Sequence, residues 1–187
     1  MSRPGGALLS AGMDVALIVD GANVMGSRAD GWWRDRAGAM ARLHGELAAL
    51  AARGVAGPVP GTAGAGGAGG AAGAAGTAGA EGAAGAEGTA GAEGTAGPAG
   101  EAAGGRWFPH VYLVVEGRTR AVLDLVAPAP RVRVVAARGE GDDEIASLAG
   151  RLTGRRVVVT ADRELRRRCE AAGAAIAGPG WLIGQFG

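Results

Sequence analysis

The sequence predicts an α/β fold of three layers, in which a central, mostly parallel sheet of about five strands carries helices on both faces. Residues 15–19 form an uninterrupted aliphatic run, which is typical of a strand buried on both faces. After residue 110, short β-branched runs alternate with stretches of helical periodicity. Strands that alternate with helices imply a parallel sheet that is covered on both sides.

The first half of the fold is expected to hold one strand and one long helix. The strand covers residues 14–19, and a Gly-rich turn leads through residues 31–36 into a helix that ends near residue 53. We expect Trp33 inside and Trp32 exposed near the mouth of a site, while His44 is expected to be solvated. The apolar stripe of this helix recurs at spacings of three, four or seven residues and consists of Trp33, Met40, Leu43, Leu47 and Leu50.

The second half repeats strand and helix. The expected strands are residues 110–116, 131–136, 156–160 and, more weakly, 174–177. The expected helices are residues 119–126, 142–152, 162–172 and a short one from residue 179. Cys169, the single cysteine, falls on the apolar face of its helix and is expected to be a small buried hydrophobe.

A low-complexity segment divides the chain. We expect residues 1–12 to be disordered and residues 13–187 to form one domain, with a Gly/Ala-rich insert at 56–105. From Gly61 to Gly100 every third residue is glycine, which is the collagen period. Collagen also needs roughly 15–20% proline or more, whereas Pro98 is the one proline in this stretch. We therefore interpret the segment as a flexible, disordered insert rather than a triple-helical stalk.

Charge and composition narrow the possible partners. The net charge is +1 and all 19 basic residues are arginine, which is far from the basic footprint of a dedicated DNA-binding protein. One cysteine supports neither a disulfide framework nor a thiolate metal site. No apolar run reaches membrane-spanning length and no secretory leader is evident, so we expect a cytoplasmic protein with no membrane partner. The sequence does not determine the oligomeric state, and a homodimer is one possibility.

Polar residues mark the carboxyl ends of the expected strands. Asp20 and Asn23 follow the first strand, the pair Asp142–Asp143 opens one later helix, and Asp162 opens another. Taken singly, each aspartate is explained as a turn residue or a helix N-cap. Taken together they converge, because the strand-to-helix turns of one parallel sheet open on the same edge, where such sheets bind ligands.

Converging carboxylates indicate a metal site. They repel one another unless a cation is present, and oxygen ligands without His or Cys select Mg²⁺ or Mn²⁺. We expect Asp20, Asp142, Asp143 and Asp162 to hold the metal, with Asn23 orienting water or ligand. Such a site supports in-line attack of an activated water on a phosphodiester. A haloacid-dehalogenase-like phosphatase is disfavoured because position 22 is Ala. A receiver domain lacks its lysine, and no Walker loop is present.

Three motifs together resemble the PIN-like nucleases, in particular the NYN branch. They read Val-Asp-Gly-Ala-Asn-Val at the first strand, Gly-Asp-Asp-Glu-Ile near residue 143 and Val-Val-Thr-Ala-Asp-Arg-Glu around residue 162. The resemblance implies a metal-dependent ribonuclease fold with the first and fourth strands adjacent at the sheet centre. The family's metal-binding residues would correspond to Asp20, Asn23, Asp142, Asp143 and Asp162. Some members carry a further acid where this chain has Arg166, and Glu164 is the candidate substitute.

The substrate expected from these features is RNA, with single-stranded RNA favoured. Arg163 and Arg167 lie close after Asp162 and are candidates for phosphate binding, and Trp32 is a candidate for stacking on a base. A run of charges of this kind is usually only a solvated helix face, which is the alternative explanation of both arginines. Two alternatives stay open: a nucleotide pyrophosphohydrolase that uses the same metals, and a catalytically weak RNA-binding module.

Overall fold

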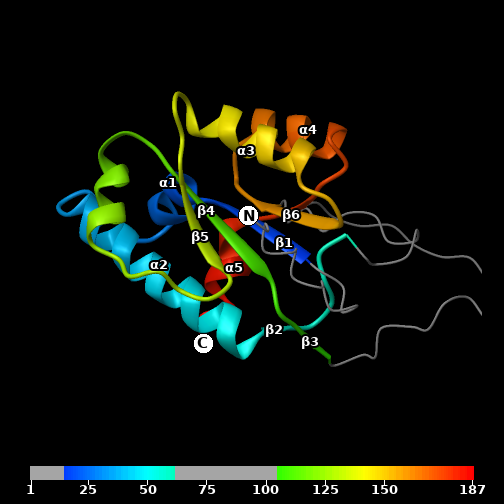
Figure 1. Cartoon of the computed structure of the whole chain (residues 1–187), viewed down its shortest axis with the longest axis horizontal. Coiled ribbons are helices and arrows are strands. Elements are labelled where there is room, and N and C mark those ends of the chain that lie inside the picture. Colours follow the sequence, from blue (N-terminus) through cyan, green and yellow to red (C-terminus); the bar gives the residue numbers. More distant parts are fainter. Residues whose placement is uncertain (1–14, 62–104) are drawn as a thin grey trace, which may run out of the picture.

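The computed structural model describes residues 15–61 and 105–187, and these residues build the expected α/β fold (Figure 1). The main sheet has the strand order β5-β4-β1-β6-β7, and every pairing in it is parallel. Its strands are β1 (Val15–Asp20), β4 (His110–Val115), β5 (Val132–Ala136), β6 (Arg155–Val159) and β7 (Ala175–Ala177). The predicted fold class is confirmed, as is the adjacency of the first strand and residues 155–159 at the sheet centre.

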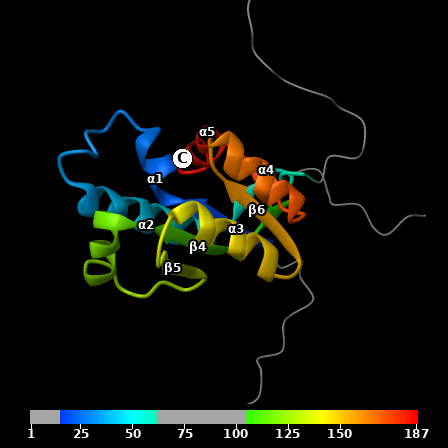
Figure 2. The same cartoon turned by 90° about the horizontal axis from the view of Figure 1, so that it is seen from above.

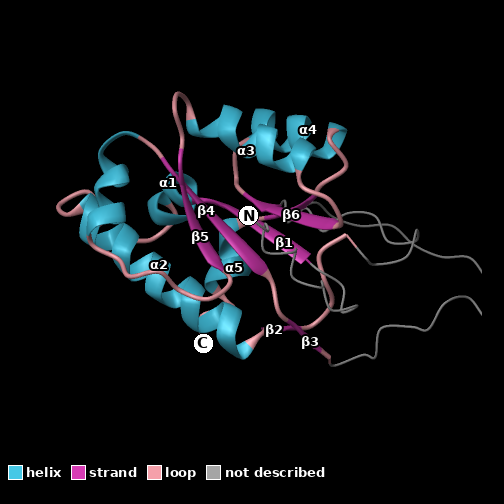
Figure 3. Ribbon diagram, viewed as in Figure 1, coloured by secondary structure: helices cyan, strands magenta, loops and turns pink. Residues whose placement is uncertain are grey.

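Helices cover both faces of the sheet, as Figure 3 shows. The helical elements are α1 (Gly21–Gly26), α2 (Arg36–Arg53), the 3₁₀ helix η1 (Gly117–Asp124), α3 (Gly141–Arg151), α4 (Arg163–Ala171) and α5 (Pro179–Ile183). On one face α3 and α4 pack over Ile18 and Val158. On the other, α1, α2 and α5 enclose Leu17 and Val19. Figure 2 shows α5 beside α1, and the two helices are in contact.

The central strand is buried on both faces, as its sequence predicts. Every residue of β1 is buried, and Leu17, Ile18 and Val19 have no exposed surface. Side chains alternate across a strand, so Leu17 and Val19 face one helical layer while Ile18 faces the other. An aliphatic run without polar alternation therefore fits a strand with a core on each side.

Where the chain leaves β1, its backbone passes very close to β4 and α2. A Cβ atom at Gly21 would lie 2.7 Å from the carbonyl oxygen of Val114 and 2.9 Å from Cε of Met40. Only a residue without a side chain lets α1 begin this close to β4 and α2. Gly21 thereby places Asp20, the residue before it, at the N-cap of α1.

Two expectations about the region of α2 are wrong. Trp33 is 57% exposed, and Trp32 is the tryptophan that packs partly buried against the core. The reason is that α2 begins at Arg36, with Asp35 as its N-cap, so helical periodicity does not extend back to the tryptophans. His44 is 6% exposed rather than solvated, because α2 packs against η1 as well as against the sheet. Burial lowers the pKa of His44.

The expected disordered segments fall largely outside the described residues. Residues 1–12 and 62–104 are among those that the structure does not describe. At the described ends of the expected insert, β2 (Val55–Ala56) pairs antiparallel with β3 (Arg106–Trp107), and Val59 is buried. The two flanks of the segment are thus joined on the domain surface. Of the described helices, none combines the length and apolar character that crossing a bilayer requires.

Candidate functional site

The site lies at the carboxyl ends of the neighbouring strands β1 and β6. The chain that follows β1 runs into α1 and α2 on one face of the sheet, and the chain that follows β6 runs into α4 on the other. This is the topological switch point of an open α/β sheet, where ligands bind beyond the carboxyl ends of the strands. Asp20 ends β1, and Thr160 directly follows β6.

Asp20 is the most buried of the acids at this edge, with 8% of its surface exposed. Its Oδ1 accepts a hydrogen bond from the backbone N–H of Asn23 at 3.0 Å, and its Oδ2 accepts one from Oγ1 of Thr160, also at 3.0 Å. Burial raises the pKa of Asp20, and these two hydrogen bonds act in the opposite direction. The charges of Glu116 and Asp162 raise the pKa further, so both acids lie within electrostatic reach.

Side chains connect the β1–α1 turn to the β6–α4 turn. Oδ1 of Asn23 accepts a 3.0 Å hydrogen bond from the backbone N–H of Ala161. Thr160, which has no exposed surface, also accepts a 3.2 Å hydrogen bond at Oγ1 from the backbone N–H of Asp162. Asn23 therefore holds the second turn in place, and its amide oxygen is engaged in that contact.

Asp162 has both a structural role and a place in the acidic edge. Its Oδ1 caps α4 by accepting a 2.8 Å hydrogen bond from the backbone N–H of Leu165. The residue is exposed, and its charge raises the pKa of both Asp20 and Asp142. The N-cap interpretation of Asp162 is correct, and it does not remove the carboxylate from the acidic edge.

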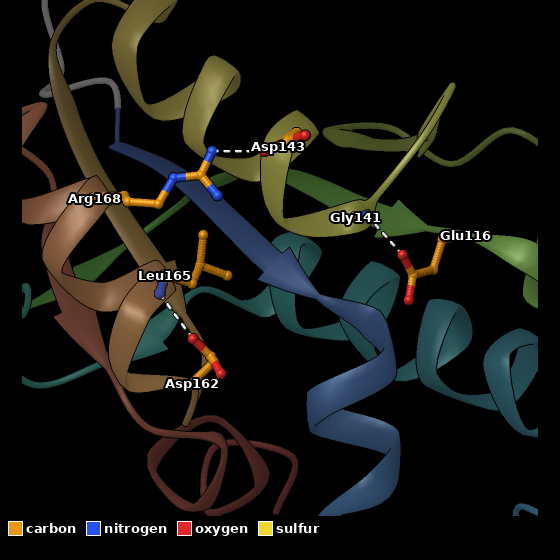
Figure 4. Close-up of polar contacts among 6 residues, drawn as sticks. All are labelled: Glu116, Gly141, Asp143, Asp162, Leu165 and Arg168. Carbon is orange, nitrogen blue, oxygen red and sulfur yellow. Dashed lines mark hydrogen bonds and ion pairs between the residues drawn. The ribbon is translucent and has the colours of Figure 1, made fainter.

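Glu116 belongs to this edge, although sequence reasoning assigned it only to the end of a strand. It directly follows β4, the neighbour of β1, and its Oε2 accepts a 2.6 Å hydrogen bond from the backbone N–H of Gly141 at the start of α3. Figure 4 shows Glu116 and Asp162 on either side of the ribbon where β1 meets α1. The signal was available: the run His-Val-Tyr-Leu-Val-Val-Glu ends in an acid, as the first strand does.

Asp142 completes a group of four acids, which we call the acidic cluster: Asp20, Glu116, Asp142 and Asp162. Partial burial raises the pKa of Asp142, and the charges of Asp20, Asp162 and Glu116 raise it further. The four residues come from four separate turns at the same edge of the sheet. Their negative charges are mutually unfavourable in the folded protein.

The other predicted acids point elsewhere. Asp143 forms a 2.7 Å ion pair with Arg168 of α4, and its side chain is 70% exposed (Figure 4). Glu164 is likewise exposed and pairs with Arg167, one of the two predicted phosphate ligands. Arg163 is exposed at the start of α4, beside Asp162. Arg166 donates from Nε to the carbonyl oxygen of Thr160 at 3.1 Å and so supports the turn that carries Asp162.

The donor set fits a hard divalent cation by its chemistry. Carboxylate oxygens without His or Cys suit Mg²⁺ and Mn²⁺, and such an ion would relieve the repulsion that raises the pKa of Asp20 and Asp142. As the side chains stand, no three His, Cys, Asp or Glu residues within 15–61 and 105–187 are arranged to enclose an ion.

A cleft of about 390 Å³ opens beside Glu116 on the β4 side of the cluster. Trp32, Arg36 and Arg118 line it together with Ala22, Glu116 and Glu140. Sequence reasoning identified Trp32 but did not assign Arg36 or Arg118 to a site. These two arginines face the cleft because η1 packs against α2.

The fold and the acidic edge together define a class: an open, parallel α/β domain with a carboxylate cluster at its switch point. Comparison with models of protein families and with curated proteins gave no significant match. Among solved structures, the chain is similar to Rae1 (YacP) from Bacillus subtilis, whose crystal structure was determined on a mutant form. The TM-score is 0.53 at 14% identity, over 93% of this chain and 75% of that one. At this identity the likeness concerns the fold alone.

Proposed function

We propose that this protein is a metal-dependent phosphodiester hydrolase acting on RNA, of the PIN/NYN-like kind. The observation that carries the proposal is the acidic cluster at the switch point, where four turns bring carboxylates together at an energetic cost. Asp20 also caps α1 and Glu116 also accepts the N–H of Gly141, but these two roles do not account for acids from four turns meeting at one edge. The shared fold with Rae1 is consistent with the proposal.

The cluster supplies what hydrolysis of a phosphodiester needs. Bound Mg²⁺ or Mn²⁺ would lower the pKa of a water and stabilise the entering and leaving oxygens of an in-line displacement. Asp20, Asp142 and Asp162 are the proposed ligands, with Glu116 added from the structure. Asn23 and Thr160 hold the turns of β1 and β6 at a fixed separation. With metal ions bound, the carboxylates would hold those ions beside the phosphate, and the ions would stabilise the negative charge that develops on it.

The remaining residues predicted from the sequence have proposed roles at the periphery of the cluster. Arg163 lies beside Asp162 and is proposed to contact a substrate phosphate, as is Arg167 when it leaves Glu164. Asp143 and Glu164 would serve as metal ligands only after release from their arginine partners. We therefore propose Asp20, Asp142 and Asp162 as the primary set.

The test is cleavage of single-stranded RNA by the purified protein with Mn²⁺, with Mg²⁺ and with chelator. We expect cleavage only with metal, and its loss in Asp20→Asn and Asp162→Asn. Asp124→Asn, an exposed acid of η1 outside the cluster, is the matched control and should retain activity. Pyrophosphate release from nucleoside triphosphates without RNA cleavage would indicate a nucleotide pyrophosphohydrolase instead. RNA binding that survives Asp20→Asn and chelator, without turnover, would indicate a binding module.

A further inference from the structure

The cleft beside Glu116 continues into a second one. The second cleft has a volume of about 410 Å³ and is lined by Trp33, Arg34, Asp35 and Ala37 together with Arg36 and Arg118, which also line the first. We call the two together the aromatic groove: Trp32, Trp33, Arg34, Arg36 and Arg118, with Glu116 at its inner end. Each half lies in the size range of small-ligand pockets, roughly 300–1,000 Å³.

The rings and guanidinium groups of the groove are arranged in pairs. Cζ of Arg36 lies 5.3 Å from the ring centroid of Trp32, and Cζ of Arg34 lies 6.0 Å from that of Trp33. The two indoles meet edge to face, with centroids 6.2 Å apart and planes at 83°. This contact limits the motion of Trp33 although more than half of the residue is exposed. An exposed indole beside arginine-lined clefts offers a ring face on which a base can stack.

The arginines of the groove are available to a ligand. Within the described residues, Arg36 and Arg118 form no ion pair with an acid, in contrast to Arg167 and Arg168 on α4. Both of the available guanidinium groups lie between the two clefts, because each lines both of them. Guanidinium groups bind phosphate oxygens bidentately, and exposed aromatic rings stack on bases of any sequence.

We infer that the aromatic groove binds a stretch of single-stranded RNA longer than one nucleotide. Arg36 and Arg118 would hold the backbone, and the exposed indole of Trp33 would stack on a base. The inner end at Glu116 then delivers a phosphodiester to the acidic cluster. This inference rests on the proposed function and specifies it: the substrate is a polymer rather than a free nucleotide, and it enters from the β4 side of the site.

Binding measured without turnover separates the groove from the catalytic proposal. The probe is a fluorescently labelled, unstructured RNA octamer titrated by anisotropy in EDTA, with adenosine 5′-monophosphate and a dinucleotide as unlabelled competitors. The variants Arg118→Gln and Trp33→Ala change exposed side chains, so both are expected to fold. Arg120→Gln on the same 3₁₀ helix and Phe108→Ala, a 46% exposed aromatic outside the groove, are the matched controls.

We expect Trp33→Ala to weaken octamer binding by about 5- to 150-fold, the range that base stacking on one ring supports. Arg118→Gln should reduce the slope of log K against log salt by about 0.7, the value for one phosphate contact of a single strand. Both controls should bind as the unchanged protein does, and competition should strengthen from the monophosphate to the dinucleotide. Circular dichroism of each variant verifies folding.

Two results would overturn the inference: octamer binding unchanged in both groove variants, or a monophosphate that competes as well as the octamer itself. RNA cleavage combined with unchanged binding in these variants would reject the groove and leave the proposed function standing. Weakened binding in the variants, combined with no cleavage under any metal, would support the groove and reject the hydrolase proposal.

Discussion

The hydroxyl of Thr160 donates a 3.0 Å hydrogen bond to Oδ2 of Asp20, a residue 140 positions earlier in the chain. Oγ1 of Thr160 also accepts a hydrogen bond from the backbone N–H of Asp162. One buried hydroxyl therefore links the carboxylate at the end of β1 to the turn that carries the next acid. Thr160 is a positioning residue: it orients two members of the acidic cluster.

Replacing this hydroxyl tests that role. Thr160→Val leaves Oδ2 of Asp20 and the N–H of Asp162 without a partner, which costs about 1–3 kcal/mol of unfolding free energy. Because the hydrogen bond from Thr160 lowers the pKa of Asp20, its loss should raise that pKa. The acidic limb of the pH–activity profile should then move to higher pH. Thr160→Ser should restore the profile, and a profile unmoved in Thr160→Val would contradict the role.

Removing the charge of Asp20 should separate stability from function. The pKa of Asp20 is raised in the folded state, so the unfolded chain ionises first as pH increases. The folded protein therefore loses stability as pH rises from the unfolded pKa, near 3.8, through the folded pKa, and the loss persists at neutral pH. In Asp20→Asn the amide oxygen still accepts from the backbone N–H of Asn23, and the Nδ2 amide, which replaces the acceptor of the Thr160 hydroxyl, donates to Oγ1 of Thr160 instead. It should be at least as stable as the unchanged protein at pH 7 in urea denaturation.

The metal dependence of stability provides the matching control. Mn²⁺ or Mg²⁺ should raise the melting temperature of the unchanged protein. At a metal concentration of one hundred times Kd, the free energy of unfolding should increase by about 2.7 kcal/mol. The gain should shrink as pH falls through the raised pKa values of Asp20 and Asp142, because protons then compete with the ion. Equal metal stabilisation of Asp20→Asn would argue against Asp20 as a ligand.

The absence of a side chain at Gly141 leaves space for the carboxylate of Glu116. A Cβ atom at Gly141 would lie 2.8 Å from Oε2 of Glu116, so Gly141→Ala should push this carboxylate away from the cluster. A displacement of about 1 Å in a catalytic site costs up to ~10²-fold in rate. Gly150→Ala in the same helix meets nothing within 4 Å and should raise stability by about 0.5–1 kcal/mol at full activity. Comparing kcat/KM and urea midpoints of the two variants checks this; equal activity would remove Glu116 from the site.

The ion pair between Asp143 and Arg168 predicts a minor role for Asp143. Both side chains are exposed, and pairs of this kind contribute little to stability in water. Asp143→Asn should therefore change metal affinity by less than about twofold, whereas Asp142→Asn should weaken it strongly. Isothermal titration with Mn²⁺ distinguishes the two. Equal losses would mean that Asp143 leaves Arg168 and joins the metal.

Cys169 is expected to be unreactive in the native protein. It is fully buried on the inner face of α4, and burial raises the pKa of its thiol to about 11. The thiolate is the nucleophile, so its small population at pH 8 and its burial both slow alkylation. Labelling with iodoacetamide should be slow in buffer and rapid in denaturing urea, with one adduct by mass spectrometry. Rapid labelling of the native protein would show that α4 opens readily.

The sequence predicted the elements well where local pattern and burial agree. The aliphatic run of β1 suits a strand that is covered on both faces, and together with the alternation of strands and helices it predicted the parallel sheet. The region of Trp32 and Trp33 was predicted wrongly because α2 begins only after its N-cap Asp35, so helical periodicity extended back to the two rings assigned them to the wrong sides. The prediction for His44 was wrong because α2 packs against η1 as well as against the sheet, so more of its surface is buried than the apolar stripe indicates.

The chain by itself determined that acids and an amide stand at the ends of successive strands, because strand and turn propensities are local. Which of them meet was decided by the tertiary structure, since strand order and helix packing are set by contacts between distant segments. The order β5-β4-β1-β6-β7 brings Glu116 beside Asp20, and the approach of α4 to α3 pairs Asp143 with Arg168. The aromatic groove likewise exists because η1 packs against α2, a contact between segments separated by the long Gly-rich stretch.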